Sequence, residues 1–229
     1  MIERKNEFAQ GAIAAVLSAA ALVGSLYINE ALEFRDTFIP GTVINGVDAS
    51  GLTVSEMEEV LGDYGLILKF RDGKDLAVSN DEIDYHYVSD GKLDALMQQQ
   101  NPYLWGAGLF RKNSHEINEK KEYSKEKLLA ILNAAPQMNE SNIIAPEDAH
   151  LGYVDGTFTV IPEVEGTTLD PELVRSTVIT AVDKEIGSVD LGNTEGIYSY
   201  PEIRKDDEDL GEEAEQLNEL AGGRVVYKL

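Results

Sequence analysis

Glu163 and Glu165, in the stretch IPEVEG, are the one carboxylate pair on an expected strand whose spacing suggests chemistry. Residues two apart on a β-strand point to the same face and lie roughly 7 Å apart. Two carboxyl groups at that separation suit general acid–base hydrolysis of a glycoside. The same spacing is common on exposed strands, where a glutamate simply accepts hydrogen bonds. That ordinary role is the default interpretation for Glu163, and no catalytic residue is assigned.

Other reactive side chains are absent or scattered. The chain has no cysteine, which excludes disulfides, thiolate metal ligands and a cysteine nucleophile within it. Its three histidines, His86, His115 and His150, lack the spacing of metal ligands. No phosphate-binding loop, dinucleotide fingerprint or nucleophile elbow occurs. We therefore expect no metal and no cofactor.

The chain is strongly acidic, with 42 acidic against 19 basic residues and a formal net charge of −23. A nucleic-acid partner would require clustered Lys and Arg, so this class of function is excluded. An exported protein without cysteine must be stabilised by its core alone, which fits the outer face of a Gram-positive type of cell.

The stretch NPYLWGAGLF places Tyr103, Trp105 and Phe110 among glycines, which predicts an aromatic loop. Such rings can stack on sugars or on another domain, and they can equally pack into the core of their own domain. Both interpretations stay open. Tyr103 and Trp105 are the predicted ligand contacts, and Glu163 is a third predicted binding residue.

Residues 11–28, GAIAAVLSAAALVGSLYI, contain no charged side chain and would span roughly 27 Å as a helix, about the thickness of a bilayer core. Arg4, Lys5 and the amino terminus together slightly outweigh Glu3 and Glu7 before this run, which favours an internal N-terminus and an external remainder. A single-pass membrane anchor is the prediction. A cleaved signal peptide and a buried helix are the alternatives.

Strand, turn and helix signals follow from residue 38 onward. Thr42 to Ile44 predicts a strand, Asn45-Gly46 a turn, and Thr53 with Glu56 a capping box at the start of a helix. Further expected elements are strands at 66–70, 76–78, 83–88, HLGYV, TFTVIPEVEG, SVDLGN and GIYSYPEI. Hairpin turns are expected at Asp72-Gly73 in RDGK and at Asp155-Gly156. Helices are expected at 90–99, at 124–133 and from Asp170-Pro171 through Ile186.

The expected fold class is α+β, with an N-terminal transmembrane helix followed by an ectodomain of antiparallel sheet and helices. The expected parts are a cytoplasmic N-terminus (1–10), an anchor (11–28), a juxtamembrane linker (29–37), an α+β module (38–205), and an acidic helix that leads into a following, missing domain (206–229). RVVYKL, residues 224–229, reads as the first strand of that domain.

As an ordered set, these motifs resemble the N-terminal region of membrane-anchored L,D-transpeptidases, with the peptidoglycan-binding module that VanW-like proteins share. The resemblance covers most of residues 38–229. Its motifs lie at Pro40 to Thr42, Ile44 to Asp48, Ser50 to Thr53, Pro162 to Gly166, Asp190-Leu191 and Tyr200-Pro201.

The resemblance implies a membrane-tethered, extracytoplasmic module that positions a cell-wall cross-linking enzyme on peptidoglycan. In that family a cysteine in a Ser-His-Gly-Cys context, further along the chain, performs the acyl transfer. This chain contains no cysteine, so no catalytic residue carries over, and whether the chain belongs to an enzyme is left open. A VanW-like accessory wall protein, or a pure spacer without an enzymatic partner domain, is the alternative.

Overall fold

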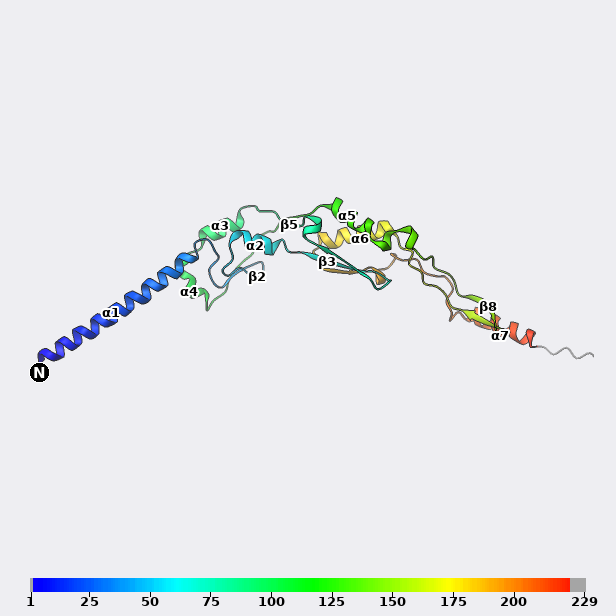
Figure 1. Ribbon diagram of the computed structural model, residues 1–229, viewed down its shortest axis with the longest axis horizontal. Coiled ribbons are helices and arrows are strands. Elements are labelled where there is room, and N and C mark those ends of the chain that lie inside the picture. Colours follow the sequence, from blue (N-terminus) through cyan, green and yellow to red (C-terminus); the bar gives the residue numbers. More distant parts are fainter. Residues whose placement is uncertain (1, 223–229) are drawn as a thin grey trace, which may run out of the picture. The chain divides into compact units, whose positions relative to one another are not determined.

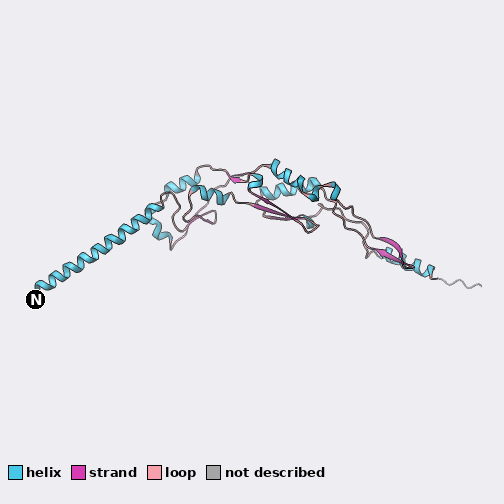
Figure 2. Ribbon diagram, viewed as in Figure 1, coloured by secondary structure: helices cyan, strands magenta, loops and turns pink. Residues whose placement is uncertain are grey.

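The computed structural model describes residues 2–222, with side chains from residue 12 onward (Figure 1). Within this range the chain forms two compact units. The first unit contains the residues up to Asp63 together with Tyr85–Tyr123, and the second contains Tyr64–Asp84 and the residues from Ser124 onward. The predicted α+β class is confirmed, because helices and short strands both occur throughout the described chain (Figure 2).

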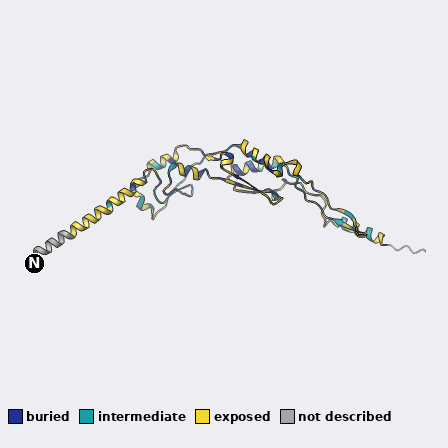
Figure 3. Ribbon diagram, in the orientation of Figure 1, coloured by how far each residue is buried: buried dark blue, intermediate teal, exposed yellow. Residues whose placement is uncertain are grey.

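Helix α1 (Ile2–Glu33) includes the whole uncharged run and continues through residues 29–33, which the sequence suggests as a linker. Its segment Ala12–Glu33 has a mean hydropathy of 1.8 and is long and apolar enough to cross a membrane, although a signal sequence would meet the same criteria. Most of its described side chains are exposed (Figure 3). An apolar helix that the protein itself does not cover needs another apolar environment.

The first unit is built around a three-stranded sheet. Strand β1 (Thr42–Ile44) pairs antiparallel with β2 (Val47–Asp48) through the predicted Asn45-Gly46 turn, and parallel with β6 (Asn113–His115). Both turn residues have positive φ, as a tight hairpin turn demands. A second, two-stranded sheet joins β5 (His86–Tyr87) to β7 (Lys121–Glu122).

Two helices and two helical turns complete the first unit: α2 (Val54–Leu61), α3 (Lys92–Gln99), a 3₁₀ turn (Pro102–Leu104) and α4 (Trp105–Gly108). The predicted capping box of α2 is confirmed, since Thr53 accepts a hydrogen bond from the Glu56 amide and Glu56 accepts one from the Thr53 amide. The core consists of Phe38, Ile44, Ala49, Met57, Leu61, Tyr87 and Leu93.

The second unit contains a mixed sheet and two helices. Strand β3 (Gly65–Lys69) pairs antiparallel with β4 (Asp75–Ser79) and parallel with β10 (Ser188–Asp190). Helices α5 (Lys125–Ala134) and α6 (Pro171–Asp183) contact each other, and α6 contacts β10. The fully buried side chains of this sheet and these helices include Leu66, Leu68, Val78, Leu128, Leu132, Val174, Val178 and Leu191.

A hairpin and the acidic helix form a further part of the second unit. Strands β8 (His150–Val154) and β9 (Thr157–Ile161) turn at Asp155-Gly156, as predicted, and α7 (Glu208–Ala221) contacts both. The Asn218 carboxamide accepts a hydrogen bond from the Phe158 amide (2.7 Å) and donates one to its carbonyl (2.8 Å). The Asn218 side chain thus bonds to the Phe158 backbone in the way that a neighbouring strand would.

Three predictions of local structure are wrong. GIYSYPEI forms no strand and contributes only an isolated bridge, Leu169 to Tyr198. Of the strand predicted at 83–88 only β5 forms, because Ile83 ends a 3₁₀ turn (Asp81–Ile83) and Asp84 adopts a left-handed conformation (φ 52°). Helix α6 ends at Asp183, so Ile186 lies beyond the helix and is 42% exposed. The strand predicted at RVVYKL lies outside the described residues.

Candidate functional site

The predicted aromatic loop is helical and packs against α1. The Trp105 ring lies 5.0 Å from the Tyr27 ring and 6.1 Å from the Phe34 ring, centroid to centroid. The Trp105 indole donates a hydrogen bond to the Tyr27 carbonyl (3.2 Å), and the Tyr27 hydroxyl donates one to the Tyr103 carbonyl (2.7 Å). Trp105 therefore has protein partners on α1, while the Tyr103 side chain is half exposed. Sugar binding by either ring stays a prediction.

Glu163 and Glu165 lie beyond the end of β9 and hold a neighbouring segment of chain. The Glu163 carboxylate accepts a hydrogen bond from the Lys205 amide (2.8 Å), and Glu165 forms an ion pair with Arg204 (3.6 Å). Backbone N–H groups of Glu163 itself and of Lys205 lower the pKa of the Glu163 carboxyl. A general acid needs a raised pKa, so these bonds favour the structural role for Glu163.

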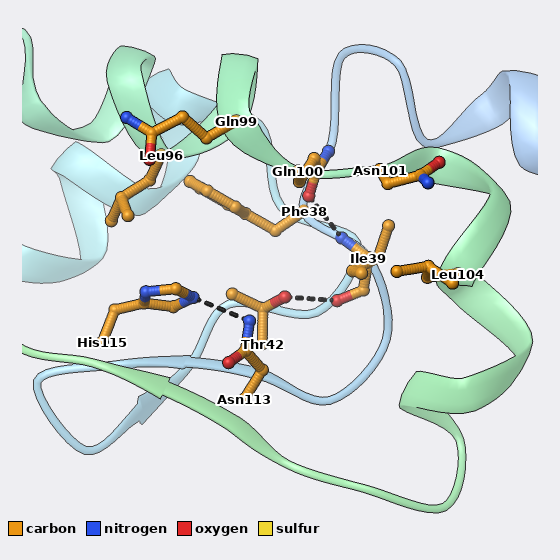
Figure 4. A pocket seen from close by; sticks show the side chains of 10 residues that line it. All are labelled: Phe38, Ile39, Thr42, Leu96, Gln99, Gln100, Asn101, Leu104, Asn113 and His115. Carbon is orange, nitrogen blue, oxygen red and sulfur yellow. Dashed lines mark hydrogen bonds between the residues drawn. The ribbon is translucent and has the colours of Figure 1, made fainter.

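The first unit contains a cavity of about 300 Å³ between the chain that follows α1 and the end of α3 (Figure 4). Most of its polar groups already have internal partners. The Gln100 carboxamide accepts from the Ile39 amide (3.1 Å) and donates to the carbonyls of Phe34 and Thr37. Asn113 and His115 contact each other at 2.9 Å. The bonds of Gln100 connect the end of α3 to the chain that follows α1, and the cavity offers few free groups to a ligand.

The second unit contains a cavity of about 390 Å³ beside the β3–β4 turn, which we call the turn cavity. Its lining residues are Asp72, Lys74, Pro136, Gln137, Asn142, Ile144, Thr167 and Tyr198. They come from four separated stretches of the sequence, and most carry side chains that can form hydrogen bonds.

Several polar groups of the turn cavity remain available. Gln137 donates to the Asp72 carboxylate (3.0 Å) and Asn142 to the Pro136 carbonyl (3.0 Å), so both carboxamide oxygens lack a partner among the described residues. The Lys74 ammonium is 4.0 Å from Asp72, and its side chain is 75% exposed. The cavity thus presents a cation, an anion and amide acceptors together, which suits a ligand made of amides and carboxylates.

Arg71, at the edge of this turn, was not identified from the sequence. Its guanidinium lies between the rings of Tyr198 (4.2 Å) and Tyr200 (4.3 Å), and Nη1 donates to the carbonyls of Glu165, Gly166 and Ser199. Its Nη2 is buried without a hydrogen-bond partner among the described residues. The Arg71 stack therefore fastens the hairpin to two distant segments and holds Tyr198 against the turn cavity.

A wider groove of about 580 Å³ runs between α6 and β10. Hydroxyl side chains dominate it, but those of Ser176, Thr180 and Thr194 donate to nearby backbone carbonyls. The Asp190 carboxylate is held by the side chain and amide of Asn193, which lower the pKa of its carboxyl. Three hydroxyl groups and the carboxylate of this groove therefore already have partners within the protein.

Among the described residues, no group of three or more His, Asp or Glu side chains could hold a metal ion. His86 and His115 lie in the first unit and His150 lies in the second.

Residues 106–190 match a family model described as "Putative peptidoglycan binding domain". The match supports a peptidoglycan-binding domain in this part of the chain, as the sequence motifs suggested. No curated protein and no solved structure matches the chain. The matched segment ends with β10, whose strand partner β3 lies before the segment. The β3–β4 hairpin therefore belongs to the same folded unit.

Proposed function

We propose that this chain is the extracytoplasmic, membrane-tethered peptidoglycan-binding and positioning module of a cell-wall cross-linking L,D-transpeptidase. The observation that carries the proposal is the family match over residues 106–190. The uncovered apolar helix α1 is the proposed tether in the cell membrane. The catalytic domain of such an enzyme would be a further part of the protein, since this chain has no cysteine to serve as the nucleophile.

The turn cavity is the proposed contact site for the peptide stem of peptidoglycan. Stem peptides carry backbone amides, free carboxylates and an amine. The Lys74 ammonium can pair with a stem carboxylate, Asp72 with a stem amine, and the oxygens of Gln137 and Asn142 with amide N–H groups. Glu163 contributes indirectly in this proposal, because it orders the chain near Lys205.

A VanW-like accessory protein or a pure spacer is the alternative function. An accessory wall protein would share the binding module and lack the transpeptidase domain, whereas a spacer would also lack affinity for the wall. A hydrolase based on Glu163 and Glu165 is disfavoured, because the Lys205 amide already bonds to the Glu163 carboxylate and Arg204 already pairs with Glu165.

Pelleting of the full chain with purified sacculi, in detergent, tests the binding function. An unrelated acidic protein of similar net charge is the control for non-specific retention. We expect Lys74→Glu to weaken pelleting by roughly threefold to tenfold, the value of a partly exposed charged contact. Lys184→Glu, the same charge change on an exposed lysine of the α6–β10 groove, should leave pelleting unchanged.

Retention no greater than that of the acidic control would favour the spacer. An effect confined to Lys184→Glu would move the site to the groove. Sequence downstream of Leu229 distinguishes the transpeptidase from the accessory protein, because only the former requires a cysteine-containing catalytic motif.

A further inference from the structure

Contacts between α1 and the rest of the first unit begin within the apolar run of α1, near its C-terminal end. The side chains from Ala12 to Gly24 are almost all exposed, whereas Tyr27 is 39% exposed and Ala31 is fully buried. Tyr27 is the second-last residue of the uncharged stretch 11–28. The protein and the apolar run therefore overlap at one end of the run, and Figure 1 shows α4 beside that end of α1.

The segment that makes this contact is the aromatic segment, which we define as residues 103–112. Trp105 stacks on Tyr27 and donates a hydrogen bond to its carbonyl, and the Tyr27 hydroxyl donates to the Tyr103 carbonyl. Both bonds fix the segment at the depth of Tyr27. Tyr and Trp are the residues that favour the boundary between hydrocarbon and lipid headgroups.

The length of the uncharged run restricts the depth at which Tyr27 can lie in a bilayer. The uncharged run spans roughly 27 Å, against about 30 Å for a hydrocarbon core. If α1 crosses a bilayer, Tyr27 cannot lie far from its boundary in either orientation of the helix. Trp105 must then lie at the same boundary.

The glycines of the aromatic segment allow it to pack closely in this place. A Cβ at Gly106 would lie 3.1 Å from the Tyr27 ring, and one at Gly108 would overlap the Pro40 carbonyl oxygen at 1.7 Å. The spacing GAG is therefore explained by close packing on α1 and on the chain that follows it. A flexible ligand-binding loop would not need these two contacts.

The outward face of the aromatic segment is apolar and ends in two cations. Phe110 is 88% exposed, Leu109 60% and Leu104 55%, and the exposed Arg111 and Lys112 come next. Neither cation forms an ion pair with another described residue. Exposed apolar side chains next to basic ones match the interfacial zone of a bilayer that contains anionic lipid.

We propose that the aromatic segment is a second membrane contact, an interfacial anchor in the leaflet where α1 leaves the bilayer. Leu104, Leu109 and Phe110 enter the boundary of the acyl chains, and Arg111 and Lys112 face anionic headgroups. The partner is the lipid surface itself. The inference rests on the proposed tether, and it assigns Trp105 to the membrane boundary in place of a sugar.

Trp105 is the one tryptophan of the chain, so its emission reports the depth of the segment without labelling. The full chain is reconstituted into liposomes of zwitterionic and anionic lipid that carry a nitroxide either near the headgroup or deep in the acyl chain. We expect the shallow nitroxide to remove roughly half of the emission and the deep one to remove less.

A relocated tryptophan tests insertion of the segment itself. Phe110→Trp combined with Trp105→Phe places the probe at the most exposed aromatic position, and shallow quenching should persist there. Val60→Trp combined with Trp105→Phe is the control, a half-exposed position on α2 in the same unit, and its quenching should be several-fold weaker. Flotation with the liposomes is measured for every variant.

The outcomes separate this inference from the tether. Flotation without quenching at position 105 or 110 would overturn the interfacial anchor and leave the tether intact. Quenching at 105 without quenching at 110 would also overturn it, because α1 alone would place Trp105 at the boundary. A Trp105 emission change caused by soluble muropeptides and not by nitroxide lipids would assign the ring to sugar. Failure to float would contradict the tether itself.

Discussion

The two units each contain a cavity, and they use its polar groups in opposite ways. In the first unit, the Gln100 carboxamide bonds to three backbone groups in the chain that follows α1. In the second unit, the carboxamide oxygens of Gln137 and Asn142 have no partner among the described residues, and Lys74 is mostly exposed. A cavity whose polar groups bond to one another stabilises a fold. A cavity whose polar groups lack partners is suited to a ligand.

This difference supports the proposed division of functions between the two units. The first unit contains the apolar helix, the aromatic segment and the connections between them. The second unit contains most of the family match and the turn cavity. We therefore attribute anchoring to the first unit and wall contact to the second.

Core truncations should give the largest effects and show whether the two units are separately stabilised. Leu132→Ala should lower the free energy of unfolding of the second unit by about 2–5 kcal/mol, because a fully buried side chain is replaced by a cavity. Met57→Ala should cost a similar amount in the first unit. Hydrogen exchange measures both, and the lost protection should fall in the unit that carries the substitution. Equal losses in both units would contradict the division.

The Arg71 stack should be the next most sensitive feature. Arg71→Ala removes both ring contacts and the Nη1 bonds, and should cost the second unit about 1–3 kcal/mol. Arg71→Lys keeps the charge without the planar guanidinium and should recover only part of this. Thermal unfolding compares the two, and full recovery with lysine would show that stacking contributes nothing.

Helix caps offer a matched comparison between the units. Thr53→Ala removes the cap of α2 in the first unit, and Asp170→Ala removes the cap of α6 in the second, where Asp170 accepts from two amides. Each change should cost about 1 kcal/mol. Denaturant titration followed by hydrogen exchange should place each loss in its own unit. A neutral result for either variant would show that its helix is held by packing alone.

Substitution of Glu163 should give the smallest effect, a change in how the stability of the second unit depends on acidic pH. Backbone N–H groups lower its folded pKa below the ordinary value of 4.5. Its contribution to stability is therefore complete above pH 4.5 and is lost as the pH falls through the folded pKa. Glu163→Gln should flatten this part of the stability–pH curve for the second unit. An identical curve for the variant would contradict the bond between Glu163 and the Lys205 amide.

Local signals predicted most elements of the fold correctly. The capping box at Thr53, the Asp72-Gly73 and Asp155-Gly156 hairpins, and the Asp170-Pro171 helix start all occur as expected, because each depends on a few neighbouring residues. The strand prediction for GIYSYPEI was wrong because its two tyrosines do not lie on a sheet. They enclose Arg71, more than 120 residues earlier in the chain.

The turn cavity could not be predicted for the same reason. Its residues come from the β3–β4 turn, the chain after α5, the approach to α6 and Tyr198. RDGK indicated only a turn, and nothing local indicated that Lys74 would lie near Gln137. The aromatic segment was identified from composition, but its contact with α1 depends on tertiary packing that no local signal indicates.

Hydrogen exchange of the full chain with and without soluble muropeptides tests the central claim most directly. The account predicts that added muropeptides slow exchange in the second unit, around residues 136–144 and 167, with no change in the aromatic segment. Slower exchange confined to the first unit would contradict it. No change in either unit at a saturating concentration of muropeptides would also contradict it.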